Sequence, residues 1–219
     1  MLVAIDFDGV IVDSLAEILS VSDAARIELG SGREPGINDI HSLQNLTFQE
    51  FGRQIGVMEG QLVNFENLVF EQLKVSRTPS VFFAGMKECL VRLATEHTLV
   101  IVTSNITENV KRAFTTAGLD APRIFAGPTL SKTEKIQEAM AETDFATEET
   151  IMVGDGVSDI RAAKVAGVRT IAVTWGFHPE SILALEKPDF IAHSPVELMA
   201  CLGIEQLSPK DSPGGRRLI

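Results

Sequence analysis

The sequence predicts an α/β fold, in which a doubly wound parallel sheet carries a small helical domain inserted after its first strand. Beyond residue 80, short apolar runs alternate with amphipathic helical stretches. This alternation is typical of a parallel sheet that is covered by helices on both faces. Residues 15–80 break the rhythm, because they contain helical patterns and no strand-like run.

Five strands are predicted from apolar runs bounded by polar or small residues. The first opens the chain in "VAIDFDG", and the others are "HTLVIVTS", "ETIMVGD", "VRTIAVTW" and "PDFIAHS". Apolar residues at helical spacing predict the helices between them, which are "GMKECLVRLATE", "TENVKRAFTTAG", "KTEKIQEAMAE", "VSDIRAAKVAG" and "PVELMACLG". Several of these end in glycine, as helices often do.

Three further helices are predicted within the insertion, from "LAEILSVSDAARIELG", "TFQEFGRQIGV" and "QLVNFENLVFEQLK". Thr47 and Glu50 have the spacing of a capping box at the start of the second helix. Asp13 is predicted to be the N-cap of the first helix rather than a metal ligand.

These patterns predict three parts of the chain. Residues 1–14 and 81–204 form the α/β core, and residues 15–80 form the helical cap. Residues 205–219 are rich in Pro, Gly and Ser, which predicts a flexible tail.

Composition excludes several classes of partner. The net charge of -11 argues against binding to a nucleic-acid backbone. No apolar run approaches the roughly 18 residues that a membrane span needs, and the start of the chain does not read as a secretory signal. Cys89 and Cys201 are far apart in amphipathic patterns, so two free thiols and a cytoplasmic location are expected.

The chemistry-bearing residues cluster at predicted strand ends, beyond which doubly wound sheets bind their ligands. They are Asp6, Asp8, Thr103, Ser104, Asn105, Asp155 and Asp159, joined by Lys132 at a helix start. Clustered carboxylates need a cation, and oxygen ligands without His or Cys favour Mg²⁺. A hydroxyl and an ammonium beside such a metal are what phosphoryl transfer requires. One carboxylate can attack phosphorus, and a second can serve as general acid and base.

Four motifs, in this order, resemble those of the haloacid dehalogenase-like hydrolases. They are "DFDGVIVDS", "VIVTSN", "SKTEKI" and "VGDGVSDIRAAKVAGV", and the run "GVRTIAVTWGFHP" is similar to the phosphoglycolate-phosphatase-like subgroup. The resemblance implies a Rossmann-like core with an inserted helical cap. It also implies that Asp6 is the nucleophile and Asp8 the general acid/base. The metal site is implied to use Asp6, the backbone carbonyl of Asp8, Asp155 and, as an outer ligand, Asp159.

The resemblance also implies a phosphate site. Its residues are Gly9, Thr103, Ser104, Asn105 and Lys132, of which Thr103 contributes its hydroxyl and Gly9 and Ser104 their backbone amides. Lys135, one turn after Lys132, is the alternative for the basic group. Asp8 favours phosphoester chemistry, because dehalogenating members lack an acidic residue at that position.

The expected function is that of a Mg²⁺-dependent phosphatase acting on a small phosphomonoester, phosphoglycolate-like or a sugar phosphate, through an aspartyl-phosphate. A phosphomutase of the β-phosphoglucomutase type is the alternative enzyme, and a non-catalytic phosphate-binding module is the alternative from another class. A phosphonatase is less favoured because it takes a Schiff-base lysine from its cap. The only lysine of the insertion is Lys74, near its end. Oligomeric state is not determined by the sequence.

Several other residues are predicted to have no part in the chemistry. Trp175 is interpreted as packing near the crevice. Arg26 and Arg53 are interpreted as solvated helix-face residues, with a grip on the far anionic end of a substrate as the alternative. The histidines lack metal-ligand spacing and are interpreted as surface or outer groups; they are His41, His97, His178 and His193.

Overall fold

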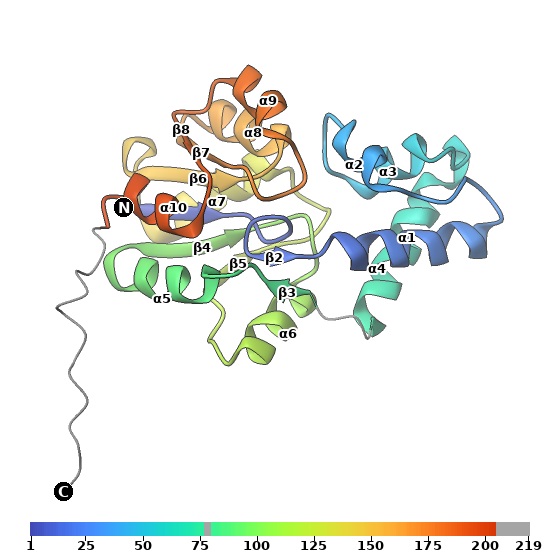
Figure 1. Cartoon of the computed structure of the whole chain (residues 1–219), viewed down its shortest axis with the longest axis horizontal. Helices are drawn as coiled ribbons and strands as arrows, with labels where there is room; N and C mark the ends of the chain where they lie inside the picture. The colour runs from blue at the N-terminus through green and yellow to red at the C-terminus, as the bar shows by residue number, and fades with distance from the viewer. Residues whose placement is uncertain (77–79, 205–219) are drawn as a thin grey trace, which may run out of the picture.

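The computed structural model describes residues 1–76 and 80–204 and contains a six-stranded parallel sheet (Figure 1). The strand order is β5-β4-β1-β6-β7-β8. The strands are β1 Leu2–Ile5, β4 Thr98–Val102, β5 Arg123–Phe125, β6 Thr150–Gly154, β7 Arg169–Val173 and β8 Phe190–Ala192. The predicted fold class, a doubly wound α/β sheet with a helical insertion, is confirmed.

Helices cover both faces of the sheet. Successive strand residues point to opposite faces, and both sets are apolar here, so each face packs against helices. Val3 and Ile5 of β1 belong to the apolar cluster that includes buried residues of α5, α6 and α10. Leu2 and Ala4 belong to the cluster of the opposite face, with α7 and α8. The helices are α5 Met86–Glu96, α6 Thr107–Ala117, α7 Lys132–Thr143, α8 Val157–Ala166, α9 Glu180–Leu183 and α10 Pro195–Cys201.

The central strand β1 lies at the point where the winding of the sheet reverses. The chain passes from β1 to β4 and β5 on one side, and then returns to β6, β7 and β8 on the other. A crevice forms at such a switch point, beyond the carboxyl ends of the strands, because the flanking connections diverge there. Asp6 directly follows the last residue of β1, so it lies at this crevice.

The insertion forms a helical cap with its own apolar cluster (right-hand side of Figure 1). Its helices are α1 Leu15–Leu29, α2 Ile37–His41, α3 Phe48–Gln54 and α4 Leu62–Val75. Buried Phe51, Phe65 and Phe70 are members of that cluster. A short antiparallel ladder joins β2, Val12–Asp13, to β3, Val81–Phe82, where the chain leaves for the cap and returns.

Some local predictions differ from the structure. The strands β2, β3 and β5 and the helix α2 were not predicted, because each has only two to five residues and too short a pattern to detect. Ser14, not Asp13, occupies the N-cap position of α1, and Asp13 lies in β2. The carboxylate of Asp13 still accepts a hydrogen bond from the Leu15 backbone N–H at 3.4 Å. The predicted tail, residues 205–219, lies outside the described residues.

The capping box of α3 forms only in part. The Thr47 hydroxyl accepts from the Glu50 N–H at 3.3 Å, as predicted. The Glu50 carboxylate instead accepts hydrogen bonds from Asn45, at 3.0 Å from its backbone nitrogen and 2.7 Å from its side-chain nitrogen. Glu50 therefore fixes the loop before α3, which carries Asn45 toward the crevice.

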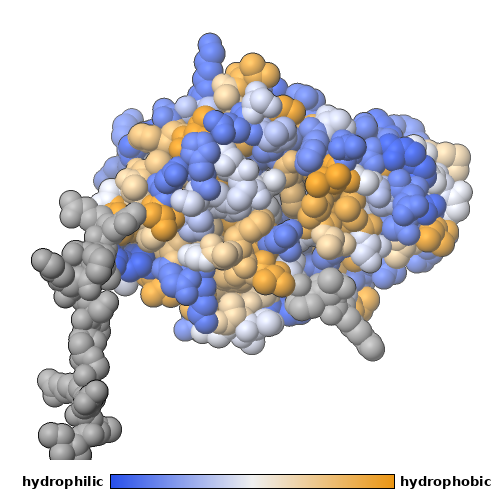
Figure 2. All heavy atoms as spheres, in the orientation of Figure 1, coloured by the Kyte–Doolittle hydropathy of each residue, from blue (hydrophilic) through white to orange (hydrophobic). Residues whose placement is uncertain are grey.

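The face shown in Figure 2 mixes hydrophilic and hydrophobic residues, and one hydrophobic group lies where the cap meets the sheet. Within the described part of the chain, no helix is long and apolar enough to cross a membrane. Cys89 is buried, Cys201 is half-buried, and both are free thiols, as expected.

Candidate active site

Lys132 joins two carboxylates that come from different elements, one at the end of a strand and one in a helix. Its ammonium lies 2.7 Å from Asp6 Oδ2 and is also hydrogen-bonded to Asp159 Oδ1. Asp6 follows β1, Asp159 lies in the first turn of α8, and Lys132 begins α7. Burial opposes the charge on Lys132, but the carboxylates of Asp159 and Asp6 raise its pKa, so it stays an ammonium. Lys132 is therefore the fixed positive charge of the site.

Asp155 completes a cluster of three buried carboxylates with Asp6 and Asp159. One oxygen from each lies within 4.8 Å of the others. Asp155 Oδ2 accepts from the Phe177 backbone N–H at 2.6 Å, whereas Asp155 Oδ1 is buried without a hydrogen-bond partner. Burial and the neighbouring carboxylates of Asp159 and Asp6 raise the pKa of Asp155.

These carboxylates fit a divalent cation. An orphaned buried carboxylate oxygen is costly unless a proton or a metal satisfies it. Burial raises the pKa of Asp6 to about 7, although Lys132 acts in the opposite direction. Three carboxylates facing one ammonium leave excess negative charge, and an all-oxygen donor set suits a hard ion. The cluster can therefore hold a metal ion.

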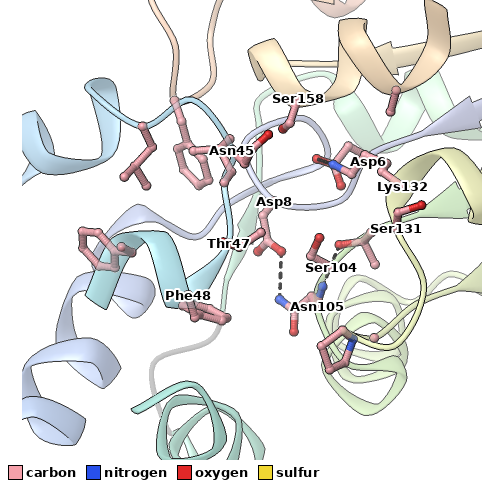
Figure 3. Close-up of a pocket in the computed structure, with 18 of the residues that line it drawn as sticks. Asp6, Asp8, Asn45, Thr47, Phe48, Ser104, Asn105, Ser131, Lys132 and Ser158 are labelled. Carbon is pink, nitrogen blue, oxygen red and sulfur yellow. Dashed lines mark hydrogen bonds and ion pairs between the residues drawn. The ribbon is translucent and has the colours of Figure 1, made fainter. Parts of the chain in front are cut away.

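Asp8 points away from that cluster. Its Oδ2 accepts a hydrogen bond from the Asn105 side-chain nitrogen at 2.9 Å, drawn as a dashed line in Figure 3. Asn105 is itself held, since its Oδ1 accepts from the Ile106 N–H at 2.7 Å and from the Asn109 side chain at 3.0 Å. Burial raises the pKa of Asp8, with the Asn105 hydrogen bond opposing it. Two carboxylates two residues apart thus occupy different environments.

Thr103 and Ser104 follow β4 and line the same pocket. Thr103 is buried, and its hydroxyl oxygen accepts from the Asn105 N–H at 3.1 Å, which leaves the hydroxyl hydrogen to donate. Beneath it, buried Lys135 donates to the carbonyls of Thr103 at 2.8 Å and Gly127 at 2.5 Å. Lys135 therefore supports the loops after β4 and β5, whereas Lys132 is the lysine that contacts the carboxylates.

Gly9 contributes to the site because it has no side chain. Its backbone N–H donates to the Val12 carbonyl at 2.9 Å, so that amide is already engaged, contrary to the expectation that it meets a phosphate. Its φ is +76°, and a Cβ there would lie 2.1 Å from Asp155 Oδ2. Only glycine lets the chain turn here with Asp155 packed against it.

A pocket of about 610 Å³ opens above the strand ends and is lined from two sides. Asp6, Asp8 and Lys132 line it from the sheet, and Asn45 and Phe48 approach from the cap (Figure 3). Of the residues predicted for the site, those that line this pocket are Asp6, Asp8, Thr103, Ser104, Asn105 and Lys132. Asp155 and Asp159 lie behind them in the carboxylate cluster.

The structure adds two residues that the sequence did not reveal. Phe177 donates its N–H to Asp155 while its side chain packs in the apolar cluster of the cap. His178 is fully buried, and its Nδ1 accepts from the Val157 N–H at 3.2 Å while its Nε2 lies 3.0 Å from the Leu43 carbonyl. His178 is therefore not a surface group, and the other alternative, an outer group of the site, stays a prediction. His178 links α8 to the cap. The "GFHP" run after β7 was the available signal.

The interpretations of Trp175 and Arg53 agree with the structure, whereas Arg26 is half-buried rather than solvated. Trp175 is partly buried against the apolar cluster of the sheet and donates to the Val10 carbonyl at 3.0 Å. Arg26 pairs with Asp23 at 2.7 Å, and Arg53 pairs with Glu59 at 2.8 Å. Neither arginine lines the pocket.

A doubly wound sheet with buried carboxylates and a lysine at its switch point, under an inserted helical cap, defines a class of hydrolase. The family model for "haloacid dehalogenase-like hydrolase" matches residues 3–173. The chain belongs to that family, and it is a hydrolase of the phosphatase type. The predicted resemblance is confirmed.

Individual relatives agree with this assignment. A phosphoglycolate phosphatase of Synechococcus elongatus is 28% identical over 199 residues, covering 89% of this chain and 93% of that protein. The pyrophosphatase PpaX of Anoxybacillus flavithermus is 39% identical over 71 residues, 32% of this chain and 33% of that one. A solved haloacid dehalogenase-like hydrolase from Streptococcus pneumoniae aligns with a TM-score of 0.79 at 22% identity, covering 92% of this chain and 97% of that one. The last comparison bears on the fold alone.

Proposed function

We propose that the protein is a Mg²⁺-dependent phosphatase that hydrolyses a small phosphomonoester through an aspartyl-phosphate on Asp6. The observation that carries this proposal is that the carboxylates of Asp6 and Asp8 have different hydrogen-bond partners. Asp6 lies against the ammonium of Lys132, and Asp8 turns to Asn105 on the other side of the pocket. Phosphatases among the relatives support the same reaction class.

In the first half-reaction, a carboxylate oxygen of Asp6 attacks phosphorus and the bond to the alcohol oxygen breaks. Lys132 keeps Asp6 available as the anion and offsets charge on the transferring group. Thr103 donates its hydroxyl hydrogen to a phosphate oxygen, and Ser104 adds its backbone amide. Asp8, whose pKa is raised by burial, gives its proton to the leaving alcohol.

In the second half-reaction, Asp8 removes a proton from water, which attacks the phosphorus of the aspartyl-phosphate. Phosphate leaves, Asp6 is restored as a carboxylate, and Asp8 holds a proton for the next cycle. Asn105 keeps Asp8 pointed at the pocket through both steps. Asp6, Asp155 and the Asp8 backbone carbonyl are the groups we assign to Mg²⁺, with Asp159 as an outer group. When bound, the ion would neutralise phosphate charge.

The cap is proposed to act as a lid. Residues 1–14 and 81–204 form the catalytic core and residues 15–80 the cap, which closes to exclude water for the first step and opens to release products. The two free cysteines support a cytoplasmic location. Solution scattering of the Asp6→Asn variant with and without substrate tests this lid. Substrate binding without movement of the cap would contradict it.

Phosphate release from a panel of phosphomonoesters, with and without Mg²⁺, tests the function. Wild-type protein should release phosphate only with Mg²⁺, and Asp6→Asn should release none while melting at a similar temperature. Asp13→Asn, an exposed neighbour in β2, is the matched control and should keep full activity. Release by Asp6→Asn at the wild-type rate would refute the covalent mechanism.

A further inference from the structure

The cap side of the pocket is mostly apolar, with Asn45, Thr47 and Glu66 as its polar members. Its side chains include Ile40, Leu43, Leu46, Phe48, Phe51 and Phe70. Phe48 and Phe70 pack edge to face, with ring centroids 5.3 Å apart, so part of this wall is rigid. The wall faces the part of the pocket that a substrate's alcohol would occupy, because its phosphate would lie at Asp6 and Lys132.

No cation from the described part of the cap lines the pocket. The basic residues there each pair with an acid on the cap itself: Arg26 with Asp23, Arg33 with Asp39, Arg53 with Glu59 and Lys74 with Glu71. The one formally charged residue that the described cap brings to the pocket is Glu66, held by the Gln49 side chain at 2.7 Å. An anionic alcohol would therefore meet a carboxylate.

Across the pocket, the core offers one more cation, Arg161 of α8. Its guanidinium pairs with Glu186 at 2.7 Å, and its side chain is 47% exposed. It is thus solvated and already neutralised. Lys132 is committed to Asp6 and Asp159. Both described basic groups of the pocket are therefore already paired with carboxylates of the protein, and a second anionic group of a substrate would have to compete with those carboxylates.

Resting on the proposed function, we infer that the substrate is a phosphomonoester of an uncharged, largely apolar alcohol. Phosphoglycolate carries a carboxylate and pyrophosphate carries a second phosphate, so both would place negative charge against Glu66 and the apolar wall. The volume of about 610 Å³ is that of a site for a drug-sized ligand, more than a glycolate fills. The protein therefore differs in substrate from the relatives named for phosphoglycolate and pyrophosphate.

Matched esters test this inference. Isobutyl phosphate has the same number of heavy atoms and the same branching as phosphoglycolate but no carboxylate. Its kcat/KM should exceed that of phosphoglycolate by at least about tenfold. Along ethyl, butyl and hexyl phosphate, whose leaving alcohols are chemically similar, kcat/KM should rise by up to about fourfold for each buried methylene.

Reversing the charge at Glu66 should shift the preference between isobutyl phosphate and phosphoglycolate. Glu66→Lys should raise kcat/KM for phosphoglycolate at least about tenfold relative to isobutyl phosphate. Glu71→Lys lies on the same helix but outside the pocket, and it should leave the ratio unchanged. A melting curve for each variant checks that the cap stays folded.

The possible outcomes separate the two proposals. Equal or better turnover of phosphoglycolate would overturn the substrate inference and leave the phosphatase intact. If no ester is hydrolysed, the proposed function fails, and calorimetric binding of hexyl phosphate and phosphoglycolate to the protein decides the substrate inference by itself. Tighter binding of hexyl phosphate supports it, and tighter binding of phosphoglycolate refutes it.

Discussion

The two walls of the pocket hold their charges in opposite ways. On the sheet side, Asp6, Asp155 and Asp159 are buried together around one lysine. On the cap side, charged residues pair on the outer surface, as Lys74 does with Glu71, and apolar side chains face the pocket. The sheet side concentrates charge away from water, whereas Glu66 is the one charged side chain that the described part of the cap brings to the pocket.

This difference separates stability from function. Burying carboxylates costs desolvation free energy that a single ammonium does not recover, so the cluster at Asp6 is poorly explained as a stabilising feature. The surface pairs of the cap contribute little to stability because water and salt screen them. The sheet side is therefore built for chemistry on a common group, the phosphate, and the cap side for the variable part of a substrate.

After the complete loss of activity expected for Asp6→Asn, the largest expected effect is the loss of activity when Asp8 changes. Asp8→Asn keeps the shape and the contact with Asn105 but cannot transfer a proton. Turnover should fall by about 10²- to 10⁴-fold, and both formation and hydrolysis of the aspartyl-phosphate should slow. Rapid-quench measurement of each half-reaction checks this prediction, and slowing of phosphorylation alone would contradict it.

The ion pairs on the two sides of the pocket should differ in their contribution to the free energy of unfolding, and removing Lys132 tests this. Lys132→Met leaves Asp6 and Asp159 without their ammonium and should lower the free energy of unfolding by about 3–5 kcal/mol in the absence of Mg²⁺. Lys74→Met breaks an exposed pair and should change it little. Urea denaturation of both variants compares them. Similar losses would show that the two kinds of pair are energetically alike.

Alanine substitutions at two glycines distinguish the effect of backbone strain from that of a steric clash at the site. Gly9 and Gly30 have φ of +76° and +60°, so alanine is strained at both positions. A Cβ at Gly30 meets nothing within 4 Å, whereas one at Gly9 collides with Asp155. Backbone strain should cost each variant about 1 kcal/mol of stability. Gly9→Ala should lose more than this because of the collision, and only Gly9→Ala should also weaken Mg²⁺ binding and activity. Equal activities would show that the Gly9 contact has no functional part.

The smallest effect is the pH dependence of stabilisation by Mg²⁺. Burial raises the pKa of Asp6 to about 7, above its unfolded value of 3.8, so the metal-free protein loses stability as pH rises toward and through 7. Mg²⁺ must displace that proton at pH 6 but not at pH 8. The rise in melting temperature caused by Mg²⁺ should therefore be a few degrees larger at pH 8. An equal rise at both values would argue against Asp6 as a ligand.

Much of the fold was predictable because its signals are local. The apolar runs of β1, β4, β6, β7 and β8 are strong enough to be read one at a time, and helical periodicity marked α1, α3 and α4. The strand β5 and the helix α2 were missed because three and five residues carry too little periodicity. Their formation depends on neighbours that only the folded chain supplies.

For the candidate site, the sequence by itself determined which residues stand at strand ends, since β1 leads directly to Asp6 and β6 to Asp155. Only the tertiary structure decided how they are used. In the folded chain, Lys132 rather than Lys135 contacts the carboxylates, and Asp8 is hydrogen-bonded to Asn105. His178 is buried between α8 and the cap. The tertiary structure also turned the cations of the cap outward. Position along a strand is encoded locally, whereas the direction and charge environment of a side chain depend on residues distant in sequence.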